Sequence, residues 1–149
     1  MTKRKEAFKL IPELTTEFET RIRFNECDPL GIVWHGHYIK YFEDGREAFG
    51  RKHGVSYLDV AESGFSTPIV KSMCEHKLSL RYGDVARIKT EYFDTPAAKI
   101  VFRYTIYDPN GDVACTGETI QVFVDKKGEL QLTNPKFYED WKRRAGLIS

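Results

Sequence analysis

The segment from Cys27 to Tyr38, which reads Cys-Asp-Pro-Leu-Gly-Ile-Val-Trp-His-Gly-His-Tyr, holds the residue types best suited to chemistry. The carboxylate of Asp28 stands beside a glycine-containing turn, and the residues after Gly31 lead toward the start of a predicted helix. The first amides of a helix have no intrahelical acceptor, so they can bind an anion or polarise a carbonyl. A thioester carbonyl held there would have its developing oxyanion stabilised, while Asp28 attacked the carbonyl carbon or activated a water.

Simpler interpretations of the same residues stay open. Aspartate is common in turns, so Asp28-Pro29 could be a turn and nothing more. His35 and His37 could orient a substrate or tune Asp28, or they could pack and hydrogen-bond at the helix start. A His-x-His pair without a further carboxylate or cysteine cluster is a poorly specified metal site, and we expect no metal there.

Other residues of the region offer alternative reactive groups. Cys27 precedes Asp28, and a neighbouring carboxylate raises the pKa of a thiol, so we interpret Cys27 as a small core residue rather than a nucleophile. Glu43 and Glu47 lie on the predicted helix. Either could be an alternative base that points into a cleft, or could form an ion pair with an arginine three or four residues further on.

The elements that must position these residues follow from hydrophobic periodicity. After a polar lead-in over residues 1–16, apolar and polar residues alternate over 17–25, which predicts a half-buried strand. Aromatic residues at helical spacing then predict a mostly buried helix over 38–53, with Gly54 as its stop. A short amphipathic segment follows at 56–62.

The rest of the chain is mainly β in character. Its pattern predicts strands and a final helix over the ranges 66–81, 86–93, 99–107, 113–124, 129–132 (short) and about 135–145 (helix). A strand, a long apolar helix and a run of antiparallel strands bury most surface when the sheet wraps around the helix. We therefore expect one α+β domain, residues 1–149, with hotdog architecture and a core over about 17–132. Its edge strands and partly apolar outer face favour self-association.

Composition narrows the class of protein. The 149 residues carry 23 Lys+Arg and 22 Asp+Glu, a formal net charge of +1, which favours neither nucleic acid nor an anionic membrane as a partner. The three cysteines, at 27, 74 and 115, form no disulfide framework and no C-x-x-C motif, which favours a reducing, cytoplasmic setting. No signal peptide is expected, and no apolar run approaches the roughly 20 residues of a membrane span.

The run Cys27-Asp28-Pro29-x-Gly31-Ile32-Val33-Trp34, followed by Tyr38, resembles the active-site signature of the 4-hydroxybenzoyl-CoA thioesterase family of hotdog proteins. The later Thr67-Pro68-Ile69-Val70 resembles that family's second block, and the resemblance covers about residues 17–125. It implies a homodimer, often a tetramer of two dimers, that hydrolyses an acyl-CoA thioester without a metal or organic cofactor. Asp28 matches the family's catalytic aspartate, and the backbone amide of His35 matches its helix-start donor.

The sequence departs from that signature in two places. His35 stands where the 4-hydroxybenzoyl enzyme has a tyrosine, and it is more similar to the acyl-CoA thioesterase branch associated with the Tol–Pal cluster. The basic run that contacts CoA phosphates in the 4-hydroxybenzoyl enzyme is replaced by a stretch in which Lys99 is the only cation. Phosphate contacts could come instead from Arg81, Arg87 or Lys89, and all four cations could be ordinary surface charges.

With the resemblance included, we expect an acyl-CoA thioesterase that is a homodimer or homotetramer. The acyl thioester would enter a tunnel at the subunit interface, with its carbonyl on the amides of His35 and Gly36 and with Asp28 supplied by the facing subunit. The substrate-binding residues expected are Gly31, Ile32, Val33, Trp34, Gly36, Tyr38, Thr67 and Lys99. An acyl-carrier-protein thioesterase and a non-catalytic module that binds acyl-CoA or a protein are the alternatives. A dehydratase or hydratase of the same fold carries a different signature, a histidine followed by loops that contain Phe-Pro, which this sequence lacks.

Overall fold

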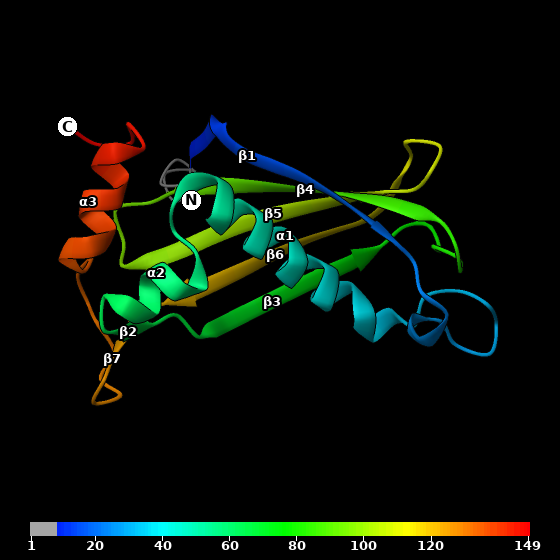
Figure 1. Cartoon of the computed structure of the whole chain (residues 1–149), viewed down its shortest axis with the longest axis horizontal. Helices are drawn as coiled ribbons and strands as arrows, with labels where there is room; N and C mark the ends of the chain where they lie inside the picture. The colour runs from blue at the N-terminus through cyan, green and yellow to red at the C-terminus, as the bar shows by residue number, and fades with distance from the viewer. Residues whose placement is uncertain (1–8) are drawn as a thin grey trace, which may run out of the picture.

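The computed structural model describes residues 9–149, in which a five-stranded antiparallel sheet carries one long helix, α1, on one face (Figure 1). The sheet has the order β1-β4-β5-β6-β3, with the strands β1 (Lys9–Arg21), β3 (Ile69–His76), β4 (Val85–Asp94), β5 (Lys99–Tyr107) and β6 (Val113–Val122). A separate two-stranded sheet pairs β2 (Phe65–Ser66) with β7 (Val124–Asp125). The helices are α1 (Tyr38–His53), α2 (Tyr57–Glu62) and α3 (Lys136–Arg144), with the 3-10 turns η2 (Phe24–Glu26) and η3 (His35–His37). This is the predicted hotdog architecture, and no helix described is long and apolar enough to span a membrane.

The core is built around α1, whose bounds are those predicted from the sequence. Its aromatic face is buried against the sheet through Tyr38, Tyr41, Phe42 and Phe49. Phe42 approaches β6 so closely that a methyl group on Gly117 would overlap its ring. Gly54 ends the helix in the left-handed conformation (φ 76°), and its amide donates to the carbonyl of Gly50, as expected of a glycine stop.

The first strand is longer than its sequence pattern predicts. β1 begins at Lys9 because it pairs with β4, starting with Lys9 opposite Asp94. The predicted polar lead-in is therefore wrong for residues 9–16, whereas residues 1–8 lie outside the described part of the chain. Backbone hydrogen bonds to a neighbouring strand form a strand even where apolar and polar residues do not alternate. A prediction based on that alternation therefore misses residues 9–16.

Other predicted strands differ at their ends. β1 stops short of Phe24, which is 78% exposed and packs edge-on against another ring instead of continuing the strand. The strand predicted over 66–81 is divided into β2 and the shorter β3. The strand predicted over 129–132 is wrong, since that segment forms a single bridge between Leu130 and Val124. The residues at which a strand begins and ends depend on where a neighbouring strand offers backbone hydrogen-bond partners.

The final helix, α3, closes the core at the end of the sheet farthest from the start of α1 (Figure 1). Tyr138 and Trp141 are buried in it, and the indole N–H of Trp141 donates to the carbonyl of His53 at 2.6 Å. The buried ammonium group of Lys142 lies 2.9 Å from a carboxylate oxygen of Asp94. α3 therefore connects the last residue of α1 to the end of β4.

One edge of the sheet, β3, is open to solvent. Seven of its eight residues are exposed, and Cys74 alone is partly shielded. No strand pairs with the outer edge of β3 among the described residues. Ile69, Val70 and Met73 add exposed apolar side chains to it. An exposed apolar edge strand is a surface on which another chain can pair.

Candidate active site

The residues between β1 and α1 form a closed loop. The amide of Asp28 donates to the carbonyl of Ile32 at 2.8 Å, and the amide of Gly31 donates to the carbonyl of Asp28 at 2.9 Å. Cys27 and Val33 form an antiparallel bridge that closes the loop. Gly31 has a φ of 80°, a left-handed conformation that other residues adopt only at a cost, which accounts for the glycine.

The side chain of Asp28 is half-buried and only partly engaged. Its Oδ1 accepts a hydrogen bond from the amide of Leu30 at 2.8 Å. Its Oδ2 has no hydrogen-bond partner among the residues that the structure describes. One oxygen therefore stabilises the turn, and the other is available to a substrate or a water.

The chain contains a second turn of the same kind, which serves as an internal comparison. In Asp108-Pro109-Asn110-Gly111, the Oδ1 of Asp108 accepts from the amide of Asn110 at 2.9 Å, and Gly111 has a φ of 84°. The turn interpretation of Asp28 is therefore correct for its local geometry. What distinguishes Asp28 is its surroundings, because Asp108 lies in the β5–β6 hairpin rather than before a helix.

The start of the helix supplies two unpaired donors. η3 leads directly into α1, and the amide of His37 donates to the carbonyl of Trp34 at 2.9 Å. The amide of Tyr38 donates to the carbonyl of His35. The amides of His35 and Gly36 precede the first of these bonds and have no acceptor in the described part of the chain. They lie at the positive end of the helix, where a developing anion is stabilised.

The indole ring of Trp34 folds back over this helix start. A methyl group on Gly36 would overlap the ring, so the packing requires glycine at that position. The centroid of the indole ring lies 5.0 Å from that of His35 and 5.7 Å from that of His37. Both histidines therefore make the packing contacts that one interpretation of the sequence predicted, and they surround the free amides with aromatic rings.

Backbone hydrogen bonds attach the loop to the sheet. Ile32 forms a bridge with Arg81, and the amide of Val33 donates to the carbonyl of Leu80 at 2.8 Å. The hydroxyl of the buried Tyr38 accepts from the amide of Leu80 at 3.4 Å. The part of the loop that follows the turn is thus held by the segment that links β3 to β4.

Glu26 is a buried carboxylate behind the loop that the sequence did not single out. It is 7% exposed, and its Oε1 accepts from the amide of Arg23 at 2.8 Å and from the hydroxyl of Tyr41 at 3.2 Å. Its carbonyl accepts from the amide of Trp34 at 3.0 Å. Burial, and then the Glu26 carboxylate, raise the pKa of Tyr41, so the phenol stays a donor. In the sequence Glu26 is one acidic residue among many, and only the fold reveals its burial.

The alternative reactive groups are poorly placed or already paired. Burial, followed by the carboxylates of Glu26 and Asp28, raises the pKa of the Cys27 thiol, which agrees with Cys27 being no nucleophile. The helix carboxylates are exposed and form the predicted ion pairs, Glu43 with Arg46 at 3.9 Å and Glu47 with Arg51 at 3.5 Å. Asp28 and Glu26 each have one carboxylate oxygen without a partner among the described residues, but Glu26 is buried, so Asp28 is the accessible one.

Two predicted site residues lie at the opposite end of the sheet. Thr67 precedes β3, and its carbonyl accepts from the side chain of Gln121 at 2.8 Å. Lys99 begins β5 at that same end, opposite Val122. The Asp28 loop lies where β3 ends and β4 begins, and the eight residues of β3 span about 25 Å (Figure 1). Within one chain, Thr67 and Lys99 are therefore too far from Asp28 to share a substrate carbonyl.

A cavity of about 1090 Å³ opens at the Thr67 end of the sheet. Residues of α1, α2, α3 and the sheet line it, including the aromatic side chains of Phe49, Phe102 and Trp141. Its size lies slightly above the range of about 300–1,000 Å³ that is usual for small-molecule sites. The apolar space and the free amides thus lie at different ends of one subunit.

The four candidate phosphate-binding cations differ in their surroundings. Arg87 pairs with Glu17 at 2.9 Å and Lys89 lies 3.8 Å from Glu91, so both have carboxylate partners. Arg81 is exposed, forms no ion pair among the described residues, and adjoins the Asp28 loop through its bridge to Ile32. Arg81 is therefore the cation best placed beside the candidate site.

A hotdog sheet whose central helix begins with free amides beside a half-buried aspartate defines a protein equipped to hydrolyse an activated carbonyl. Residues 22–143 match the profile of the thioesterase-like superfamily, and the chain belongs to this superfamily. It is a thioester hydrolase, which confirms the activity expected from the sequence. The role of each site residue stays a prediction.

Several relatives support this assignment. YneP of Bacillus subtilis (strain 168), provisionally named an acyl-CoA thioesterase, is 32% identical over 123 residues, 83% of this chain and 89% of YneP. The 4-hydroxybenzoyl-CoA thioesterase of Pseudomonas sp. (strain CBS-3) is 30% identical over 118 residues, 74% of this chain and 84% of that enzyme. Its solved structure has a TM-score of 0.73 and 28% identity over 85% of this chain and 98% of its own. The DHNA-CoA thioesterase structure from Staphylococcus aureus has a TM-score of 0.79 and 25% identity, and the match covers 89% of this chain and 92% of that chain.

Proposed function

We propose that the chain hydrolyses an acyl-CoA thioester, with Asp28 as nucleophile or general base and with the amides of His35 and Gly36 as donors to the oxyanion. The observation that carries the proposal is the combination of a half-buried carboxylate with one free oxygen and two amides without acceptors at the helix start that follows. The relatives named as acyl-CoA thioesterases support CoA as the carrier of the acyl group.

In this mechanism the thioester carbonyl oxygen accepts hydrogen bonds from the two amides, which face the negative charge as it develops. Losing one such donor typically costs about 10²–10³ in rate. The free oxygen of Asp28 attacks the carbonyl carbon to give a mixed anhydride, which water hydrolyses, or it takes a proton from the water that attacks. In both routes the carbon–sulfur bond breaks, CoA leaves as a thiolate that gains a proton, and the acyl group leaves as a carboxylic acid.

The complete site would combine two subunits. Antiparallel pairing of two β3 edges brings the end of β3 in one subunit beside the start of β3 in the other. In this arrangement Asp28 comes from the same subunit as the free amides, unlike the expectation from the sequence that the facing subunit supplies it. Both would then face the Thr67 end of the partner, where the cavity lies. The exposed apolar edge of β3 supports this homodimer, because it offers unpaired backbone groups and apolar side chains to a second copy. The acyl chain would occupy the apolar cavity of the second subunit.

The test is release of free thiol from a panel of acyl-CoAs, from acetyl to palmitoyl together with benzoyl and 4-hydroxybenzoyl. Asp28→Asn preserves the turn, since asparagine also accepts from the amide of Leu30, but it should lose at least about 10²-fold in turnover. The matched control is Asp108→Asn, which makes the same change in the same kind of turn and should keep wild-type turnover. Near-wild-type turnover of Asp28→Asn would remove Asp28 from the mechanism. A folded wild type without turnover on any acyl-CoA would contradict CoA as the carrier.

A further inference from the structure

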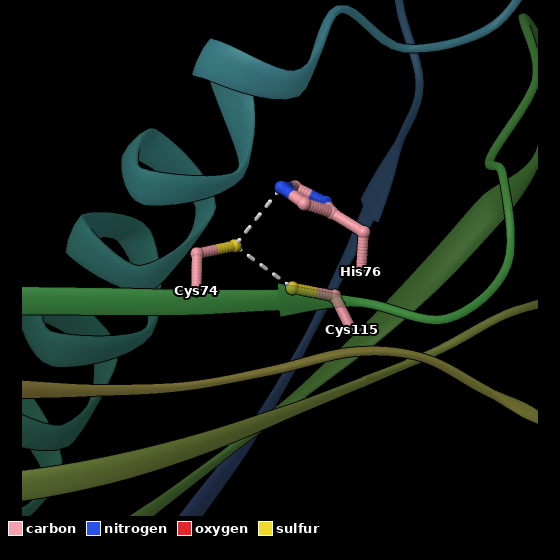
Figure 2. Close-up of side chains that lie close together, drawn as sticks. All are labelled: Cys74, His76 and Cys115. Carbon is pink, nitrogen blue, oxygen red and sulfur yellow. Dashed lines mark hydrogen bonds between the residues drawn. The ribbon is translucent and has the colours of Figure 1, made fainter.

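Three ligating side chains meet on the helix-facing side of the sheet, under the start of α1 (Figure 2). Cys74 and His76 are two residues apart on β3 and so point to the same face of the sheet, and Cys115 lies on β6 opposite His76 in the register. The Sγ of Cys74 is 3.2 Å from the Sγ of Cys115 and 3.6 Å from the Nε2 of His76. All three ligand atoms lie within 4.8 Å of one another.

We propose that Cys74, His76 and Cys115 bind one thiophilic metal ion per chain, with Zn²⁺ as the ion that fits best. Zn–S bonds of about 2.3 Å and Zn–N bonds of about 2.0–2.1 Å place two tetrahedral sulfur ligands about 3.8 Å apart, and a sulfur and a nitrogen about 3.6 Å apart. The distance from the Sγ of Cys74 to the Nε2 of His76 already has this value, and the two sulfurs need to separate by about 0.6 Å. The ligand atoms of Cys115 and His76, which lie within 4.8 Å of each other, would have to approach by at most about 1.2 Å. The donor set is also one that zinc prefers over harder cations.

The charge of the site favours an ion held by thiolates. A Zn²⁺ ion that displaces two thiol protons leaves the net charge of the cluster unchanged, so this partly buried position carries no uncompensated charge. The neighbouring Glu75 and Lys77 pair with each other at 2.6 Å and are not needed as counter-ions.

The three ligands connect an edge strand to its neighbour. Two of them belong to β3 and one to β6, so a bound ion would join these strands at the end of the sheet next to the helix start. Three protein ligands leave one coordination position for water. The ring of His76 also lies 4.8 Å from that of Tyr38 and 6.5 Å from that of His35, centroid to centroid. The site is therefore adjacent to the proposed oxyanion donors, but its existence does not depend on their role.

The first experiment titrates the reduced full-length protein with Zn²⁺ and with Co²⁺ in the absence of oxygen. We expect one ion per chain, a thiolate-to-cobalt charge-transfer band, and a higher melting temperature with Zn²⁺ because the ion binds the folded chain. His76→Gln and Cys74→Ser should each lower the affinity at least about 10-fold. The matched control is Cys27→Ser, which removes the thiol outside the cluster and should leave the affinity unchanged.

A second measurement on the wild type avoids any effect of substitution on folding. Bound Zn²⁺ should protect Cys74 and Cys115 from alkylation, as read by peptide mass spectrometry, and should leave the rate at Cys27 unaltered. The proposal is overturned if the protein, with all three thiols reduced, binds no stoichiometric Zn²⁺, or if His76→Gln and Cys74→Ser bind it as tightly as the wild type does. It is also overturned if freshly isolated protein carries a Cys74–Cys115 disulfide, which would make the pair a redox couple.

Discussion

The indole ring of Trp34 covers the α-carbon of Gly36 at the point where the helical run into α1 begins. The contact leaves no room for a side chain on Gly36, and it holds an aromatic ring that is 49% exposed beside the two unpaired amides. The position of the proposed oxyanion donors therefore depends on this packing as well as on the hydrogen bonds of the loop.

Gly36→Ala should impair catalysis more than folding. The added methyl group overlaps the indole ring, so either Trp34 or the amide of residue 36 must move. We expect a fall in kcat/KM of about 10²-fold, the cost of one misplaced oxyanion donor, with a loss of unfolding free energy of at most about 1–3 kcal/mol. Thiol-release kinetics and urea unfolding measure the two effects.

The double variant Trp34→Ala/Gly36→Ala separates the clash from other effects of the methyl group. Removing the indole ring restores the space for the methyl group. Adding Gly36→Ala to the Trp34→Ala variant should therefore lower kcat/KM by a smaller factor than adding Gly36→Ala to the wild type. If the two losses simply add, the clash with Trp34 is not the cause.

Tyr41→Phe should lower stability through Glu26. The phenol donates to the buried Glu26 carboxylate, and loss of a hydrogen bond to a charged group costs about 1.5–3 kcal/mol. The control is Tyr82→Phe, because Tyr82 is exposed and its hydroxyl forms no hydrogen bond among the described residues, so the change should be at most about 0.5 kcal/mol. Equal unfolding free energies for the two variants would show that the contact with Glu26 has no special weight.

Arg81→Ala should weaken the binding of CoA without affecting the chemical step. Arg81 lies beside the Asp28 loop and forms no ion pair with any residue from 9 to 149, and loss of one phosphate contact at an exposed site should raise KM about 10-fold. The same variant should keep the wild-type KM for an N-acetylcysteamine thioester, which lacks the nucleotide phosphates. Arg87→Ala, whose arginine already pairs with Glu17, is the matched control. An equal rise in KM for both substrates would contradict a phosphate contact.

Met73→Lys should separate the proposed dimer and abolish turnover together. Met73 lies near the middle of β3, where antiparallel pairing of two β3 strands brings each residue close to its own copy, so two lysines would repel. Light scattering should show a monomer, and thiol release should fall to the level of Asp28→Asn. Phe18→Lys makes a comparable change on the opposite edge strand, β1, and should keep both assembly and activity. A fully active monomer would contradict the two-subunit site.

The sequence by itself determined the features that depend on nearby residues. Aromatic spacing located α1, Gly54 predicted its end, and the Asp-Pro-x-Gly pattern predicted the turn at Asp28, because capping and turn chemistry operate within a few residues. The order of elements was enough to predict a sheet around a helix, since few arrangements bury both. The signature around Asp28 was enough to predict the thioesterase family.

Only the tertiary structure decided the relations between distant segments. The start of β1 at Lys9 depends on pairing with β4, and the burial of Glu26 depends on contact with Tyr41 from α1. The separation of Thr67 from Asp28 follows from the length of β3. Cys74 and His76 meet Cys115 because the register of β3 on β6 places them together. Strand register is set by hydrogen bonds and packing across the sheet, so no pattern within either strand alone encodes it.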